Sequence, residues 1–199
     1  MASFSVLLLA SGLSRRFGVA DKLGADLGGV SLARRSARAF TTLDADRRIA
    51  VVADLAGAVA RDLAADGFAL VRNPAPERGQ GHALACGAAA ISDDSAVLIG
   101  LADMPFVRPE HLTRLLTAHE HANPAAVTIA CADGRRSPPV LFGPAHLDTL
   151  RALDGDDGGR AVMRGASDIR EVDLPEAALR DIDTPEDLAL ARQELAPHG

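Results

Sequence analysis

The sequence of 199 residues predicts an α/β fold built around a largely parallel β-sheet. Short apolar runs alternate with segments of helical character along nearly the whole chain, which is the pattern of repeated βαβ crossovers. Hydrophobic residues make up 48% of the chain, which is enough to bury one sizeable core. Because no repeat, low-complexity tract or long linker divides the chain, we expect a single domain over residues 1–199.

The predicted strands are short apolar segments, and the predicted helices are the longer stretches between them. In chain order, we expect strands at residues 5–11, 49–52, 69–71, 96–101 and 126–130, with weaker ones near 140–142 and 169–172. We expect helices at residues 31–43, 56–66, 81–91 and 109–121. This order predicts a sheet whose strands are connected by helices.

Two helix starts are marked by their own residues. Pro109 followed by Glu110 is typical of a first helical turn, where proline fits and an acid suits the helix dipole. Thr184 is expected to cap a second helix that begins at Pro185, with acidic residues behind it.

Composition and charge exclude several classes of function. Aromatic residues are 3% of the chain and the net charge is −6, which argues against a nucleic-acid partner. Cys86 and Cys131 lack zinc-site spacing, and reduced thiols are expected. The apolar start at residues 4–10 has no basic segment before it, and no run reaches the roughly 20 apolar residues of a membrane helix. We expect a soluble, cytoplasmic protein without a membrane partner.

The first predicted strand leads directly into a loop of small and basic residues. Residues 9–12 (Leu-Ala-Ser-Gly) are followed by Arg16 and Lys22. Open α/β sheets bind ligands at the carboxyl ends of strands, where small residues let a phosphate approach and cations balance its charge. Neither the Walker pattern nor the three-glycine dinucleotide fingerprint fits this loop. The loop is predicted to handle phosphate; the alternative is an ordinary turn with solvated arginines.

Three aspartates are candidates for a metal site. Asp103 follows the buried run 97–101, where a carboxylate is costly unless it is paired or bound to a cation. Pro105 prevents a helix from starting at once, which weakens the alternative that Asp103 is a helix cap. Asp181 and Asp183 are two apart on an extended segment, so only one of them is expected to join Asp103. A pair of aspartates without histidine suits Mg²⁺.

The opening loop resembles that of nucleotidyltransferases with the sugar-transferase-like α/β fold, and within them most closely the molybdenum cofactor cytidylyltransferase family. Four further segments agree in the expected order: Asn73-Pro74 with residues 79–81, residues 101–105, residues 139–142 with 155–160, and residues 181–188. The resemblance therefore spans nearly the whole chain. It implies a Rossmann-like three-layer sandwich with a mostly parallel mixed sheet.

The resemblance also implies an activity. A Mg²⁺-dependent enzyme would transfer CMP from CTP to the phosphate of molybdenum-loaded molybdopterin and release pyrophosphate. A molybdoenzyme or its chaperone would then be a delivery partner. The alternatives are a guanylyltransferase of the same kind, a nucleotidyltransferase for a sugar or polyol phosphate, and a non-catalytic chaperone that carries the cofactor.

The resemblance assigns roles to individual residues. Arg16 would contact the β- and γ-phosphates and Lys22 the α-phosphate, while Asp103 and Asp183 would hold Mg²⁺. The implied nucleotide-binding residues are Leu9, Ala10, Ser11, Gly12, Gly79, Gly81 and His82. His82 replaces a small residue of many relatives. The alternative to nucleotide binding is that His82 faces solvent at the start of a helix. Asp156 and Arg160 lie in a glycine-rich turn on the acceptor side, where Arg160 would pair an acceptor phosphate or cap the C-terminus of a helix.

Overall fold

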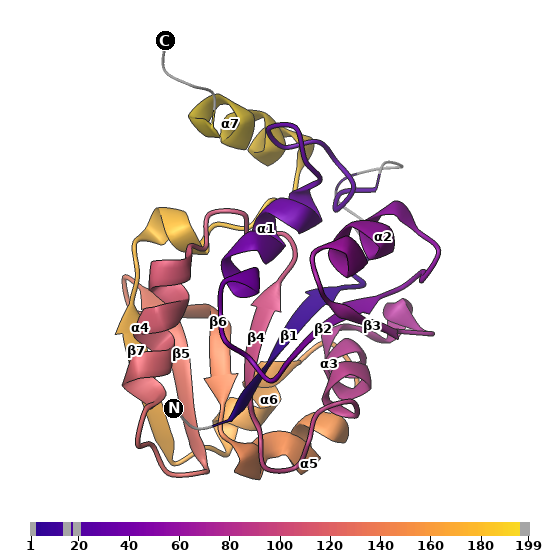
Figure 1. Ribbon diagram of the computed structural model, residues 1–199. Coiled ribbons are helices and arrows are strands. Elements are labelled where there is room, and N and C mark those ends of the chain that lie inside the picture. The colour runs from indigo at the N-terminus through magenta and orange to yellow at the C-terminus, as the bar shows by residue number, and fades with distance from the viewer. Residues whose placement is uncertain (1–2, 14–16, 18–20, 196–199) are drawn as a thin grey trace.

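The computed structural model describes residues 3–13, 17 and 21–195, and within them the predicted strands form one sheet (Figure 1). The described strands are β1 (Phe4–Ala10), β2 (Arg47–Val52), β3 (Ala69–Arg72), β4 (Ala96–Leu101), β5 (Ala126–Ala132), β6 (Arg135–Phe142) and β7 (Asp168–Asp173). Their order across the sheet is β3-β2-β1-β4-β6-β5-β7. Only β6 runs antiparallel to its neighbours β4 and β5, so the expected mostly parallel mixed sheet is confirmed.

Helices cover both faces of the sheet and make a three-layer sandwich (Figure 1). One face is covered by α1 (Leu32–Thr41), α2 (Ala58–Ala65) and α4 (Pro109–His119), and the other by α3 (Gln80–Ala88), α5 (Leu147–Arg151) and α6 (Gly159–Arg164). α7 (Pro185–Leu195) lies beyond the end of the sheet, and its Leu188 and Ala191 join the core on the α1 side. Alternate residues of β1 point to opposite faces. Val6 and Leu8 therefore pack into the core on the α1 side of the sheet, and Leu7 and Leu9 pack into the core on the α3 side.

The centre of the sheet brings together the two strand ends that matter for the site. β1 and β4 are parallel neighbours in which Leu9 lies opposite Leu101. The backbone N–H of Ala102 continues the ladder by donating to the carbonyl of Leu9 at 3.0 Å. The loop after β1 and the turn that contains Asp103 therefore leave the sheet side by side, at its carboxyl edge.

The four predicted helices are present with slightly shifted bounds, and both marked helix starts hold. α4 begins at Pro109, and α7 begins at Pro185. Residues 155–160 are only partly the expected turn, because α6 begins at Gly159. Arg160 accordingly lies in the first turn of α6, and not at the C-terminus of a helix. α5 and α6 are not predicted by the sequence, because helices of five and six residues are too short to show an apolar repeat.

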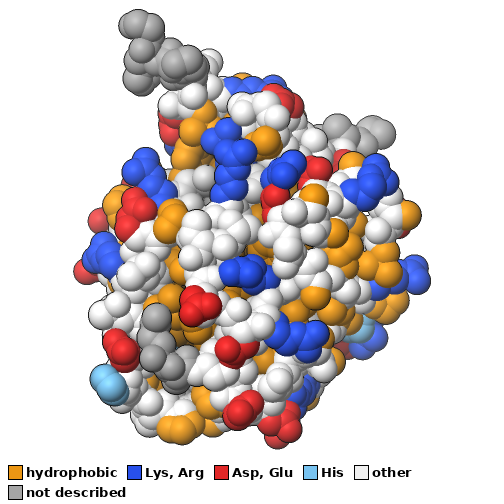
Figure 2. Space-filling view, viewed as in Figure 1, with side chains coloured by type: hydrophobic (Ala, Val, Ile, Leu, Met, Phe, Trp, Pro, Cys, Tyr) orange, Lys and Arg blue, Asp and Glu red, His pale blue; other side chains and the backbone are white. Residues whose placement is uncertain are grey.

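The surface agrees with the acidic composition. On the face seen in Figure 2, acidic and basic side chains are interspersed and form no extended basic surface among the described residues. Within residues 3–13, 17 and 21–195, no helix has both the length and the apolar character needed to cross a membrane.

Candidate active site

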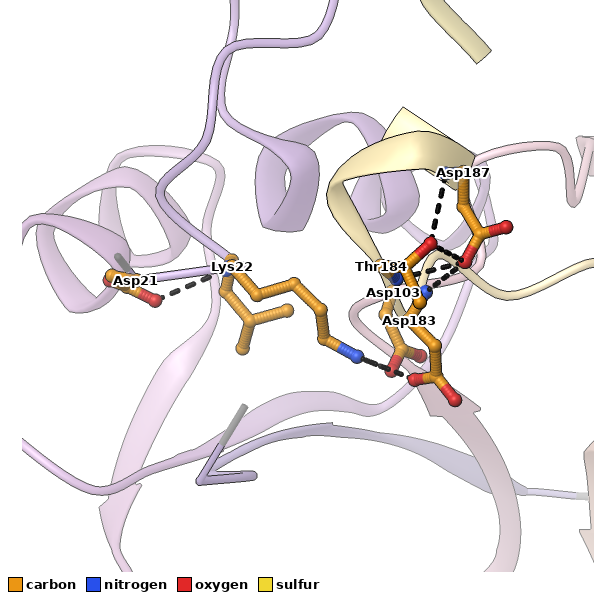
Figure 3. A network of polar contacts seen from close by, with 7 residues as sticks. Asp21, Lys22, Asp103, Asp183, Thr184 and Asp187 are labelled. Carbon is orange, nitrogen blue, oxygen red and sulfur yellow. Dashed lines mark hydrogen bonds and ion pairs between the residues drawn. The ribbon is translucent and has the colours of Figure 1, made fainter. Parts of the chain in front are cut away.

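Lys22 joins two aspartates that are far from it in the sequence (Figure 3). Its Nζ donates a hydrogen bond to Oδ2 of Asp103 at 2.8 Å and another to Oδ1 of Asp183 at 3.1 Å. Lys22 lies in the loop after β1, Asp103 in the turn after β4, and Asp183 directly before α7. The backbone N–H of Ile182 donates to the carbonyl of Asp103 at 2.9 Å, which fastens the third segment to the second. The structure thus brings three of the predicted site residues together.

The Lys22 ammonium is charged in this environment. Burial alone would lower its pKa, since only 9% of the side chain is exposed. The charges and hydrogen bonds of Asp103 and Asp183 outweigh burial, and the net effect raises the pKa of Lys22 above its usual value. One ammonium therefore faces two carboxylates, and this leaves the cluster with an excess of negative charge.

Asp103 has a second carboxylate oxygen that is buried without a partner. No hydrogen-bond donor of any described residue reaches its Oδ1. A buried carboxylate oxygen that is left unpaired is costly, and a bound cation would remove that cost. In the part of the chain that the structure describes, no group of three or more His, Cys, Asp or Glu side chains could hold a metal. Two carboxylates beside a cavity are ligands that suit a hard divalent cation, which prefers oxygen donors.

The three residues line a cavity of about 380 Å³, here called the first cavity. Of the residues predicted to bind nucleotide, the first cavity is lined by Leu9, Ser11, Gly12 and Gly79. Sequence reasoning missed Leu13, Leu23, Pro76, Glu77, Gln80, Ala83 and Leu101, which also line it. Gln80 lies between Gly79 and Gly81, which were predicted to bind nucleotide. This position could have identified Gln80 as a lining residue.

The charges around the first cavity are mostly negative. Among the described residues, its lining holds the Lys22 ammonium against the carboxylates of Glu77, Asp103, Asp156 and Asp183. An anionic phosphate chain would be repelled by this lining unless further cations entered with it. Arg16, the other predicted cation, lies outside the described residues.

Three predicted nucleotide-binding residues do not line the first cavity. Ala10 is buried in the core under α1, α2, α4 and α7. The Gly81 N–H is occupied, because it donates to the carbonyl of Gly155 at 2.7 Å. His82 turns away from the cavity, so that its Nε2 lies 3.8 Å from Cys86 Sγ and its Nδ1 lies 4.0 Å from an oxygen of Asp154. His82 is the third residue of α3, within its first turn, and these two contacts fix its direction.

Gly79 and the first residues of α3 pack closely against residues 154–156. Gly79 has a φ of 92°, and a Cβ there would lie 2.1 Å from Oδ1 of Asp156. A Cβ at Gly81 would lie 2.7 Å from the carbonyl oxygen of Asp154. Gly79 is therefore required for its positive φ and for close approach, and Gly81 for close approach alone.

A second cavity of about 310 Å³ adjoins the first. The two share the residues Leu9, Gln80, Leu101 and Asp156. Arg160 and Asp181 line the second cavity and not the first. Asp181 and Asp183 thus point into different cavities, as expected for residues two apart on an extended segment. Burial, together with the charges of Asp183 and Asp103, raises the pKa of Asp181.

Comparison with known proteins gives one matching family profile and one curated relative. The profile is described as a MobA-like NTP transferase domain and matches residues 6–172. Over 127 residues, the chain is 29% identical to the purine catabolism protein PucB of Bacillus subtilis (strain 168). That match covers 60% of this chain and 59% of PucB, so the chain spans less than two thirds of its curated relative.

Solved structures share the fold. Rv0371c from Mycobacterium tuberculosis H37Rv has a TM-score of 0.82 at 20% identity, over 96% of this chain and 98% of that one. A manganese complex of Rv0371c has a TM-score of 0.76 at 18% identity, over 98% and 100% of the two chains. A molybdopterin-guanine dinucleotide biosynthesis protein A from Archaeoglobus fulgidus has a TM-score of 0.67 at 19% identity, over 96% and 98%.

Proposed function

The chain belongs to the MobA-like NTP transferase family, and on that basis we propose that it transfers CMP from CTP to the phosphate of molybdenum-loaded molybdopterin. The observation that carries the proposal is the meeting of Lys22, Asp103 and Asp183 in one cavity at the carboxyl edge of β1 and β4. An ammonium and a pair of carboxylates with one unpaired buried oxygen suit the phosphates of a nucleotide and a divalent cation.

In phosphoryl transfer of this kind, the protein takes little part in the covalent chemistry. An oxygen of the acceptor phosphate attacks the α-phosphorus, the bond to the bridging oxygen of pyrophosphate breaks, and pyrophosphate leaves with that electron pair. The acceptor oxygen is already anionic, so no general base is needed. Lys22 would turn from the carboxylates to an α-phosphate oxygen and offset the charge that grows there.

Asp103 and Asp183 would hold Mg²⁺, which when bound supplies charge neutralisation at the phosphates. The excess of carboxylates around the first cavity supports a requirement for a divalent cation. The structurally similar Rv0371c forms a complex with manganese, which is also a divalent cation. Arg16 belongs to the same proposal as a ligand of the β- and γ-phosphates.

The two adjoining cavities support a reaction between two substrates. We assign the nucleotide to the first cavity, where Ser11, Gly12 and Gly79 leave the backbone open to a base edge. The acceptor would occupy the second cavity, with Arg160 near its phosphate and Asp156 in the shared wall. The Archaeoglobus fulgidus protein of the same fold is named for a pterin dinucleotide, which agrees with a pterin acceptor.

Release of pyrophosphate tests the proposal. CTP, GTP, ATP and UTP are each incubated with Mg²⁺, with and without molybdenum-loaded molybdopterin. We expect release from CTP only when the pterin is present. A preference for GTP would make the chain a guanylyltransferase, and turnover with a sugar phosphate would overturn the pterin acceptor. Tight pterin binding without pyrophosphate release would favour a cofactor chaperone. The same proposal includes a cytoplasmic location and a single domain over residues 1–199. It also includes delivery of the product to a molybdoenzyme or its chaperone.

A further inference from the structure

The start of α7 is tied directly to the residue that carries the second carboxylate of the site. Oδ2 of Asp187 accepts hydrogen bonds from the backbone N–H of Asp183 at 3.1 Å, the N–H of Thr184 at 2.8 Å and the Thr184 hydroxyl at 2.8 Å (Figure 3). In return, the Asp187 N–H donates to Oγ1 of Thr184 at 3.1 Å. One carboxylate oxygen therefore gathers three donors within a single turn.

Capping the helix does not require all of these bonds. Thr184 satisfies the N–H of Asp187, and this bond alone is an ordinary N-cap. The bond that the Asp183 N–H donates to Asp187 lies before the cap and adds nothing to the helical bonds. Its effect is to hold the backbone of Asp183 in place, next to Ile182, whose N–H is bound to the carbonyl of Asp103.

We propose that Asp187 is a positioning residue, which holds the Asp183 carboxylate against Asp103 so that the two can share one cation. This inference rests on the proposed function, because it takes Asp103 and Asp183 as the cation ligands. Mg²⁺ demands near-ideal octahedral geometry at ligand distances of about 2.0–2.1 Å, so a small displacement of one carboxylate weakens binding. Residues that orient metal ligands typically contribute about 10–100-fold to metal affinity.

The test compares Mn²⁺ affinity with fold stability in the nucleotide-free protein. We expect Asp187→Ala to weaken Mn²⁺ binding, measured by isothermal titration calorimetry, by about tenfold or more. Ser31→Ala is the matched control, because Ser31 caps α1 through its bond to the Arg34 N–H and lies outside the site. The control should show a comparable loss of thermal stability with Mn²⁺ affinity within about twofold of wild type.

A kinetic readout separates positioning from catalysis. In Asp187→Ala, the apparent KM for Mg²⁺ should rise, while kcat at saturating Mg²⁺ stays close to that of the wild type. If Asp187→Ala does not fold, Asp187→Asn fills the same space with a weaker acceptor, and its Mn²⁺ affinity should still fall at least threefold. Mn²⁺ affinity equal to wild type in a folded Asp187 variant would overturn the inference.

A third variant tells the two proposals apart. Asp103→Ala should abolish Mn²⁺ binding if the aspartates hold the cation at all. If Asp103→Ala binds Mn²⁺ normally, the proposed cation site is wrong. If Asp103→Ala loses binding and Asp187→Ala does not, the cation site stands and only the positioning role fails.

Discussion

Replacing Lys22 with Met tests whether the ammonium stands in for a cation between the two aspartates. The substitution keeps the length and the apolar stem of the side chain but removes the charge that bonds Asp103 at 2.8 Å and Asp183 at 3.1 Å. Two carboxylates would then face each other with no charge between them. We expect the metal-free protein to lose stability and to bind a divalent cation more tightly.

The structure sets the size of both effects. Removing one partner of a fully buried ion pair costs about 3–5 kcal/mol, but the two aspartate side chains are 22% and 38% exposed, so water screens part of the loss. We expect about 2 kcal/mol, which lowers Tm by roughly 4–8 °C for a chain of this size. Unit charges about 4 Å apart near a protein surface interact by about 4 kcal/mol, so loss of the ammonium should raise Mn²⁺ affinity at least tenfold.

Thermal unfolding with and without Mn²⁺ measures the two effects together. Mn²⁺ should raise the Tm of Lys22→Met by more than it raises the Tm of the wild type. Lys22→Arg keeps the charge and serves as the control, with a Tm near that of the wild type. Turnover of Lys22→Met should fall by about a hundredfold or more, because the charge on the α-phosphate is greatest in the transition state. An unchanged Tm together with unchanged Mn²⁺ affinity would refute the reasoning.

Three further predictions follow from other parts of the molecule. Asp103→Ala should reduce turnover by about a hundredfold or more with the fold intact by circular dichroism, and near-normal turnover at saturating Mg²⁺ would contradict its role. Burial lowers the pKa of His119, whose Nδ1 lies 2.9 Å from the Thr128 hydroxyl. The unfolded chain therefore binds a proton more readily, so the free energy of unfolding in urea should fall as pH drops below about 6.5, and less so in His119→Gln. Gly79→Ala places a Cβ 2.7 Å from the backbone carbonyl oxygen of Gly155 at a positive φ, and should destabilise the protein by more than about 1 kcal/mol and raise the KM for nucleotide.

The sheet could be predicted from the sequence because its strands carry their own signal. Residues 6–10 and 97–101 are continuous apolar runs, typical of strands buried on both faces. The position of Asp103 follows from the same signal, because the residue after a central parallel strand must lie at the ligand edge. Lys22 was found through its place in the loop that follows the other central strand.

The rest of the site depends on contacts between distant segments. Gln80 lines both cavities because residues 79–81 lie against residues 154–156. The glycines on either side of Gln80 indicate a close approach, but they do not identify residues 154–156 as its partner. The direction of His82 was likewise decided by where α3 begins, since a shift of one residue turns a side chain by about 100° around a helix. The bond that the Asp183 N–H donates to Asp187 extends the predicted cap of α7 by one residue, and the residue types alone do not specify it.

The long separation of Lys22 from its partners has a consequence for the newly made chain. Asp103 lies 81 residues after Lys22, and Asp183 lies 161 residues after it. Every described strand is complete by Asp173, so the sheet can form during synthesis before Asp183 has left the ribosome. A chain cut after residue 175 would contain every described strand but would leave Lys22 with one of its two carboxylates. If Asp103 and Asp183 hold a cation as proposed, that site is complete only once Asp183 has joined the segments made long before it.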